Sequence, residues 1–266
     1  MLRRVHLFGY DLVAEPSIDP VVTEVLGWTG SPAGEEPVVC TPNVDDILKL
    51  TRAEHAELGV RLRSAQFQLP DGMPLVWASR LLGSAVPARL AGSDLFNEVW
   101  TGLRDSGRGI VVIAPNDEVA RLLEAEHPGC ATVVPPFFDA SVPEEVAPLV
   151  TECLAALDKS GASHLVTGIS FPKQQAIGFA VIDACRAEGR PAPLVMFLGA
   201  SPEFYLGIKK RAPRWMQRAG LEWFHRFISE PRRLFHRYFV DDPKFAVIVW
   251  REWRTKRNAP AAGGAA

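Results

Sequence analysis

Gly109-Ile110-Val111-Val112-Ile113 is a run of four β-branched residues after a glycine, and an amphipathic segment, residues 116–127, begins shortly afterwards. A short unbroken apolar run of this kind is typical of a strand that is buried on both faces. The segment after it has the length and periodicity of a surface helix. A buried strand followed at once by a helix indicates an α/β fold with parallel strands.

The same alternation extends along the chain in both directions. Further buried strands are expected at residues 5–8, 37–40, 131–134, 164–167 and 194–198. Further helices are expected at residues 44–59, 143–160 and 173–189. This rhythm predicts a Rossmann-like, doubly wound and mostly parallel sheet, which binds ligands beyond the carboxyl ends of its strands.

Four polar or small residues follow predicted strands directly, namely Thr41, Asn116, Ser170 and Ala200. Because the carboxyl ends of parallel strands meet at one edge of a sheet, we expect these four residues to line that edge.

The turn Pro70-Asp71-Gly72 follows an apparent strand and precedes apolar sequence. Such a turn holds Asp71 on short, stiff backbone, and a carboxylate placed there is a candidate general base. Ordinary turn punctuation is the alternative explanation.

The composition fits one large α/β domain, or such a domain with an appendage. The chain has 266 residues, of which 47% are hydrophobic, enough for a full core. No stretch reaches the length of an apolar membrane span, and the N-terminus lacks the apolar core of a signal peptide, so a cytoplasmic protein is expected. Cys40, Cys130, Cys153 and Cys185 are isolated, which favours free thiols over a zinc site or disulfides.

The charge is distributed unevenly. Residues 208–257 hold fourteen Lys and Arg against five Asp and Glu, a local balance of +9 in a chain whose net charge is −2. Aromatic and other apolar residues alternate with these cations, which suits an anionic membrane surface. A solvated basic face is the simpler alternative, and nucleic acid is disfavoured because no recognition motif accompanies the charges.

The strand rhythm stops near Gly207. We therefore expect an α/β domain at residues 1–207, a helical, basic and amphipathic appendage at 208–257, and a disordered Ala/Gly/Pro-rich tail at 258–266.

Several blocks occur in an order and spacing that is similar to one family. They are Thr41-Pro42-Asn43, Pro70-Asp71-Gly72, residues 88–95 (ARLAGSDL), 168–175 (GISFPKQQ), 210–217 (KRAPRWMQ), 220–226 (GLEWFHR) and 230–233 (EPRR). From about Val5 to Phe245 the chain resembles the WecG/TagA/CpsF family of bacterial glycosyltransferases, which extend cell-surface polysaccharides on a polyprenyl-diphosphate lipid. The resemblance implies a fold of the GT-E type, a nucleotide-sugar donor, a lipid-linked saccharide acceptor and a peripheral location on the inner face of the cell membrane, with a homo-oligomer possible.

The resemblance also implies roles for individual residues. Asp71 would be the catalytic base, with Thr41 and Asn43 beside it, although these two residues could instead cap the helix that begins at Val44. Donor binding would involve Gln174, Lys173, Arg89, Asp94 and Gly168, although capping explains Asp94 equally well, and Lys173 could be a solvated surface lysine. Three arginines of the appendage, Arg226, Arg233 and Arg237, would stabilise the leaving diphosphate or bind lipid phosphate.

No cofactor and no metal are expected. A DxD pair at a strand end is missing from the sequence, and Asp241-Asp242 precedes a proline, as in a turn. The missing DxD pair favours metal-independent catalysis, and the resemblance implies inverting transfer of a hexose or N-acetylhexosamine from a UDP-sugar. Departures from the family at Ala114, Pro135 and Gln175 leave a weak or inactive relative with a scaffolding role as the alternative. A dinucleotide-dependent oxidoreductase is disfavoured because no GxGxxG follows a predicted strand.

Overall fold

The computed structural model describes residues 1–31, 34–213, 215–216 and 219–258. Its centre is a six-stranded sheet of order β4-β3-β8-β7-β5-β6 in which every neighbouring pair is parallel. The strands are β3 (Glu36–Cys40), β4 (Ala65–Gln68), β5 (Ile110–Ile113), β6 (Cys130–Val133), β7 (His164–Thr167) and β8 (Leu194–Phe197). The predicted α/β fold with a parallel sheet is confirmed.

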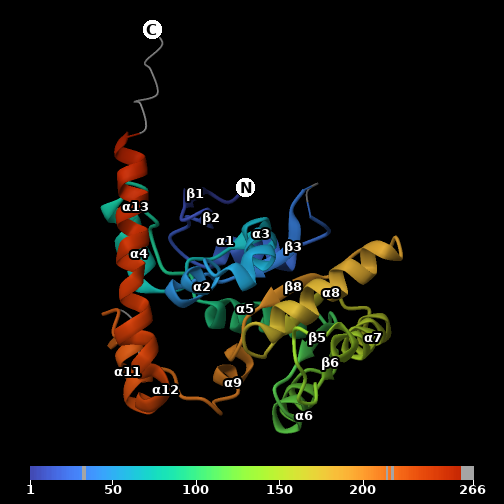
Figure 1. The fold of residues 1–266 in the computed structure, drawn as a ribbon. Coiled ribbons are helices and arrows are strands. Elements are labelled where there is room, and N and C mark those ends of the chain that lie inside the picture. Colours follow the sequence, from blue (N-terminus) through green and yellow to red (C-terminus); the bar gives the residue numbers. More distant parts are fainter. Residues whose placement is uncertain (32–33, 214, 217–218, 259–266) are drawn as a thin grey trace.

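Helices cover both faces of this sheet (Figure 1). Successive strand residues alternate between two core clusters, as Val111 and Val112 do, because side chains of a strand point to opposite faces. One cluster is completed by α1 (Asp19–Leu26), α5 (Gly92–Asp105) and α6 (Asp117–Glu126). The other is completed by α2 (Val44–Lys49), α3 (Ala56–Arg63), α4 (Met73–Leu81), α7 (Pro143–Ser160) and α8 (Lys173–Ala187).

The path of the chain creates the crevice for a ligand. β3 and β4 form one side of the sheet, β5 and β6 form the other, and β7 and β8 come last and lie between them. From β5 the chain therefore moves outward to β6 and returns to the inner side at β7. A reversal of this kind opens a crevice beyond the carboxyl ends of the strands, where a doubly wound sheet binds its ligand.

Two sequence predictions about the first third of the chain were wrong in part. The strand at residues 5–8 exists as β1 (Arg4–Leu7), but it pairs antiparallel with β2 (Tyr10–Val13) outside the large sheet. Phe8 and Gly9 have φ values of 55° and 77°, which suit the tight turn of a hairpin. The single helix expected at residues 44–59 is broken into α2, the 3-10 turn η1 (Ala53–His55) and α3, because the backbone of Arg52 is extended (ψ 141°).

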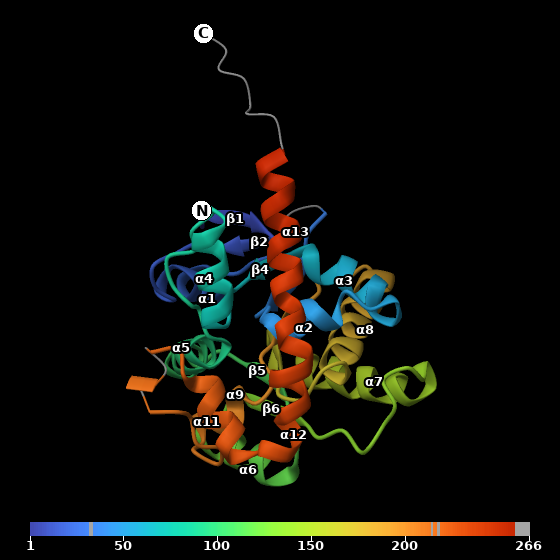
Figure 2. The same ribbon diagram turned by 60° about the vertical axis from the view of Figure 1, so that its left-hand side comes forward.

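Beyond β8 the described chain is helical wherever it has regular structure. α9 (Ser201–Tyr205) packs on α5, and the C-terminal segment contains α11 (Glu222–Ser229), α12 (Pro231–His236), η2 (Arg237–Asp241), η3 (Asp242–Lys244) and α13 (Phe245–Asn258). Asp241 and Asp242 lie in η2 and η3, so the turn predicted there is helical instead. Figure 2 shows α13 running up the front of the molecule, with α4 to its left.

Among the described residues we find no helix whose length and apolar character would let it span a membrane. The tail predicted to be disordered lies, from residue 259 onward, outside the described residues. All four cysteines are free, with Cys40, Cys153 and Cys185 buried and Cys130 half-buried, as predicted.

Candidate active site

The turns after β3 and β4 are tied together by backbone hydrogen bonds. The amide of Leu69 donates to the carbonyl of Cys40 (2.9 Å), and the amide of Asp71 donates to the carbonyl of Pro42 (3.1 Å). These bonds place Asp71 next to Asn43 at the edge of the sheet. The positions after the other strands lie along the same edge, so the prediction for Thr41, Asn116, Ser170 and Ala200 is confirmed.

Asp71 is oriented by a neighbouring arginine. Arg89 Nε donates to Asp71 Oδ1 (2.9 Å), and Nη1 of the same guanidinium donates to Glu222 Oε2 (2.5 Å). Burial disfavours the charged form of Arg89, but the charges of Asp71 and Glu222 outweigh this effect and raise its pKa. The three side chains are exposed by 28% (Asp71), 14% (Arg89) and 15% (Glu222), so the chain of charges is largely shielded from water while Asp71 keeps an accessible surface.

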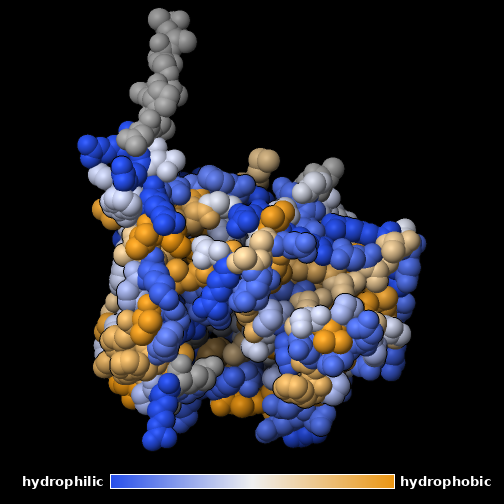
Figure 3. Space-filling model, viewed as in Figure 1, coloured by the Kyte–Doolittle hydropathy of each residue, from blue (hydrophilic) through white to orange (hydrophobic). Residues whose placement is uncertain are grey.

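A cavity of about 130 Å³ opens beside Asp71. It is lined from the α/β body by Asn43, Val44, Asp71, Gly72, Met73, Pro74 and Arg89, and from the C-terminal segment by Gly220, Glu222, Trp223, Arg237, Tyr238 and Asp242. We call it the Asp71 pocket. The C-terminal segment therefore supplies one wall of the pocket that holds the predicted base. Figure 3 shows this face of the molecule hollowed between the C-terminal helices, at the left, and the α/β body.

Close contact at Gly220 holds that wall in place. Gly220 has a φ of 72°, and a Cβ atom added there would lie 2.8 Å from the indole of Trp77 on α4. Only glycine combines this backbone conformation with such a close approach to an aromatic ring. The Gly220-Leu221-Glu222 stretch is thus fixed against α4, with Glu222 directed at Arg89.

Asn43 caps helix α2, as the alternative explanation of this residue predicted. Its Oδ1 accepts from the amides of Asp45 (2.9 Å) and Asp46 (3.2 Å), while Nδ2 donates to Asp46 Oδ2 (2.6 Å). The backbone amide of Asn43 donates to the same oxygen of Asp46 (3.3 Å), which completes a capping box. The side chain still lines the Asp71 pocket, so capping positions the amide there.

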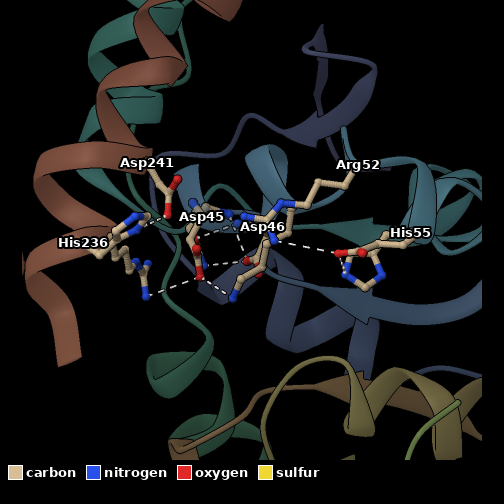
Figure 4. Close-up of polar contacts among 10 residues, drawn as sticks. Asp45, Asp46, Arg52, His55, His236 and Asp241 are labelled. Carbon is tan, nitrogen blue, oxygen red and sulfur yellow. Dashed lines mark hydrogen bonds and ion pairs between the residues drawn. The ribbon is translucent and has the colours of Figure 1, made fainter.

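An acidic cluster joins α2 to the C-terminal segment (Figure 4). Asp45 Oδ2 lies 2.7 Å from Lys49 Nζ and 3.5 Å from Arg237 Nη1. Burial, together with the neighbouring charge of Asp45, raises the pKa of Asp46 from 3.8 to about 7. Burial likewise raises the pKa of Asp242 to about 6, although Arg237 opposes this shift. Arg237 thus sits among carboxylates at the rim of the Asp71 pocket.

Gln174 lies at the centre of the strand edge. Its Oε1 accepts from Thr167 Oγ1 and from the amide of Gly199, both at 3.3 Å, so it links the ends of β7 and β8. Gln174 and Thr41 line the same small cavity of about 30 Å³. The sheet therefore brings these two predicted site residues together.

A second hollow, of about 410 Å³, lies beyond β5, β6 and β7. Gly168 and Lys173 line it, together with Phe137 and Phe138. The ammonium of Lys173 lies 4.3 Å from the ring centre of Phe137 and 4.7 Å from that of Phe138. A Cβ atom at position 168 would lie 2.8 Å from the carbonyl oxygen of Ile113, which accounts for the glycine. Lys173 at the start of α8 thus places a cation in this hollow, which is separate from the Asp71 pocket and which we call the Lys173 hollow.

The remaining predicted site residues are distributed differently. Asp94 lies in the first turn of α5 and forms an ion pair with Arg211 (2.6 Å), away from both hollows. The side chains of Arg226 and Arg233 lie outside the described part of the structure. Among the described residues, no group of three or more His, Cys, Asp or Glu side chains is arranged to hold a metal ion.

Two residues, Glu222 in the Asp71 pocket and Asp46 next to it on Asn43, were not predicted to act there. Glu222 stood in the GLEWFHR block (residues 220–226) without an assigned role, and Asp46 was not among the candidate site residues. The pairing of Glu222 with Arg89 spans 133 residues, so only the fold reveals it. For Asp46, the spacing of Asn43 and Asp46 was the available signal, because these positions suit a capping box.

Comparisons with known proteins identify the family of this chain. The model of the glycosyl transferase WecG/TagA/CpsF family matches residues 5–259. One similar protein is the N-acetylglucosaminyldiphosphoundecaprenol N-acetyl-β-D-mannosaminyltransferase of Bacillus subtilis (strain 168). It is 28% identical over 201 residues, which cover 74% of this chain and 73% of the relative. Because the family model spans nearly the whole chain, this protein belongs to the WecG/TagA/CpsF family of glycosyltransferases.

Proposed function

We propose that this glycosyltransferase moves a hexose or N-acetylhexosamine from a UDP-sugar to a saccharide carried on polyprenyl diphosphate, at the inner face of the cell membrane. The observation that carries the proposal is the position of Asp71 in a pocket shared by the carboxyl edge of the sheet and the cationic C-terminal segment. The similar B. subtilis protein is named for an acceptor of this class, a lipid diphosphate that carries N-acetylglucosamine.

Asp71 acts as the general base in the proposed reaction. Arg89 Nε holds Oδ1 of Asp71 by a hydrogen bond. Oδ2 then accepts the proton of the acceptor hydroxyl as that oxygen attacks the anomeric carbon. The nucleotide diphosphate leaves from the opposite side of this carbon, so a single displacement inverts the anomeric configuration.

Cationic side chains supply the charge that the leaving diphosphate needs. Lys173 faces the larger hollow, where it would stabilise the diphosphate that leaves the donor, while Arg237 lines the Asp71 pocket, where it would meet the diphosphate of the acceptor. Fixed cations in a partly desolvated site stabilise developing negative charge without a metal. We therefore propose metal-independent transfer, with the donor nucleotide in the Lys173 hollow and the acceptor in the Asp71 pocket.

A second candidate function follows from the aromatic wall of the Lys173 hollow. The ammonium of Lys173 is engaged with the rings of Phe137 and Phe138, within a block where the sequence departs from the family. A protein that binds the nucleotide or the lipid without efficient transfer, and that scaffolds polysaccharide assembly, would keep this arrangement.

A transfer assay separates the two functions. Purified protein is incubated with single UDP-sugars and a synthetic N-acetylglucosaminyl-diphosphate lipid, with and without EDTA, and the product anomer is determined by NMR. The proposal expects one preferred donor, an inverted anomer and an initial rate unchanged by EDTA. Nucleotide binding without product formation would favour the scaffold, and loss of activity in EDTA with rescue by magnesium or manganese would contradict metal independence.

A further inference from the structure

A long apolar groove lies between α4 and α13, and we call it the α4–α13 groove. Its walls are Pro74, Trp77, Ala78 and Leu81 on one side and Pro243, Phe245, Ala246, Val249, Trp250 and Trp253 on the other, with Asp242 at one end. Its volume of about 740 Å³ falls in the range of about 300–1,000 Å³ that is typical of sites for small molecules. The mechanism described above makes no use of it.

Contacts near both ends of α13 keep the groove open. The ring of Phe245, at the first residue of the helix, lies 5.1 Å from the ring of Phe8 in the β1–β2 hairpin. Near the other end, Lys256 donates a hydrogen bond to Ser84, in the loop after α4. Between these contacts Leu81 is 71% exposed and Trp250 is 51% exposed. The two helices are thus fixed side by side with their apolar walls uncovered.

The groove is continuous with the Asp71 pocket. Pro74 and Asp242 line both cavities, and Asp71 and Gly72 directly precede α4, one wall of the groove. A molecule whose reacting end lies at Asp71 can therefore extend its other end along α4 without leaving the protein surface.

The charges around this path match an amphiphile with an anionic head. Arg237 lies in the Asp71 pocket, where the groove begins, and it is paired there with Asp45, which an anionic head group would replace as its partner. Along the groove, the guanidinium of Arg254 lies 4.7 Å from the ring of Trp250, and that of Arg257 lies 5.0 Å from the ring of Trp253. Cations thus lie at the head and along one wall of the groove, while its lining is almost entirely apolar and suits a hydrocarbon chain.

From these observations we infer that the α4–α13 groove binds the first isoprenoid units of the lipid acceptor. The inference rests on the proposed function, because it assigns the diphosphate of that acceptor to the Arg237 end and the saccharide to Asp71. The hydrocarbon then gains affinity by removing apolar surface from water, on both the chain and the groove. The enzyme would distinguish a polyprenyl diphosphate from a free diphosphate without a bilayer.

Binding of farnesyl diphosphate tests the site directly. Calorimetric titration of the full chain, without vesicles, is expected to show at least about tenfold tighter binding of farnesyl diphosphate than of inorganic diphosphate. Ala246→Trp places an indole in the groove and should remove this difference. Val247→Trp is the matched control, because Val247 is the next residue of α13, is 48% exposed and does not line the groove. Equal binding of the two ligands by the wild type, or an unchanged preference in Ala246→Trp, would overturn the inference.

Circular dichroism checks that the variants are folded. Should Ala246→Trp fail to fold, Leu81→Glu replaces it, since this exposed side chain tolerates charge but would make the groove polar. Loss of the farnesyl preference in folded Leu81→Glu supports the inference, and its retention contradicts it.

Sedimentation with anionic vesicles distinguishes a tail site from a face that only touches a bilayer. Ala246→Trp adds an aromatic ring, so a membrane-contacting face should keep or gain vesicle affinity while a tail site is blocked. The inference is supported if Ala246→Trp still binds vesicles but no longer prefers farnesyl diphosphate. The opposite combination would assign the groove to the bilayer.

Transfer assays with farnesyl-diphosphate and methyl-diphosphate saccharides separate this inference from the proposed function. The wild type should show at least about a tenfold lower KM for the farnesyl acceptor, and Ala246→Trp should show similar KM values for both. Farnesyl binding in the groove without transfer to either acceptor would contradict the proposed function and leave the groove assignment standing. Transfer to both acceptors with equal KM values in the wild type would support the proposed function and contradict the groove assignment.

Discussion

Arg89 Nε lies 2.9 Å from Oδ1 of Asp71, and the pair joins two turns that are 18 residues apart in the chain. The amide of Leu90 donates to the carbonyl of Pro70 (2.9 Å). A backbone hydrogen bond and a side-chain hydrogen bond therefore hold the same two turns together. The carboxylate is therefore held in one orientation before any substrate arrives. Because Glu222 engages the other end of the guanidinium, that orientation depends on the C-terminal segment being docked.

Asp71→Asn should lower kcat by about a hundredfold to ten-thousandfold, because it removes a general base while keeping the size of the side chain and its suitability for a turn. Initial rates with saturating donor and acceptor measure the effect. Asp105→Asn is the control, since this carboxylate is exposed at the end of α5. Near wild-type turnover by folded Asp71→Asn would show that another group accepts the proton.

Glu222→Gln should reduce kcat by a smaller factor, about tenfold, because Arg89 loses one charged partner but can still donate to Asp71. A positioning role predicts a lower kcat with little change in the KM of the donor, and steady-state kinetics separates the two parameters. Glu98→Gln, an exposed change on α5, serves as the comparison. A rise in donor KM at constant kcat would argue that Glu222 contacts the donor.

Gly220→Ala should loosen the C-terminal segment from the α/β body, because the new Cβ would meet the indole of Trp77. Gly83→Ala is a matched control: Gly83 has a similar φ of 69° but no heavy atom within 4 Å of an added Cβ. Both substitutions incur the cost of left-handed backbone, about 1–2 kcal/mol, and Gly220→Ala adds the clash. Limited proteolysis should cleave residues 222–258 faster in Gly220→Ala alone, and equal protection of the two variants would contradict the close contact.

Asp46 should make stability depend on pH. Its pKa is raised in the folded protein to about 7, so the folded state binds a proton that the unfolded state releases near pH 4. The contribution is complete below about pH 4 and is lost as the pH rises through about 7. Urea unfolding at intervals from pH 5 to 8 should show this loss in the wild type, on the order of 2–3 kcal/mol, and a flatter profile in Asp46→Asn. Parallel profiles would mean that Asp46 is ionised throughout this range.

The C-terminal segment should bind anionic vesicles in a salt-dependent manner. Its exposed aromatic residues include Trp223, Phe224, Phe235, Phe239, Trp250 and Trp253. Each basic residue near an anionic surface contributes about 1 kcal/mol, and salt screens this attraction. We expect sedimentation at low ionic strength, partial release at high salt and weaker binding by the Arg254→Glu/Arg257→Glu double variant. Charge reversal at Arg121 and Arg190 of the α/β body is the control. If both double variants weaken vesicle binding equally, the binding depends on net charge and not on the C-terminal segment.

Local patterns predicted the inner strands of the sheet well, because β3, β5, β7 and β8 are buried along their whole length and are rich in apolar residues, as residues 110–113 are. The hairpin of β1 and β2 was not predicted, because a short apolar run such as residues 5–8 can form a strand of a parallel sheet or of an antiparallel hairpin. The end of α2 depends on the extended backbone of Arg52, which side-chain periodicity does not report.

In the site, too, local sequence patterns predicted some features and missed others. Asp71, Thr41, Asn43 and Gln174 stand in turns or at helix starts that follow strands, so sequence order alone places them near one edge. The contact of Glu222 with Arg89 and that of Gly220 with Trp77 depend on how the C-terminal segment folds back. Such contacts arise from tertiary packing, and no local spacing encodes them.

The strand order also constrains how the polypeptide assembles during synthesis. β3 and β4 cannot adjoin β5 and β6 until β7 and β8 are available to fill the space between them, and β8 ends at Phe197. About three quarters of the chain must therefore leave the ribosome before the central sheet becomes continuous, a long-range closure that slows folding. Until then two half-sheets expose unpaired inner edges, which makes the nascent chain a natural client for chaperones.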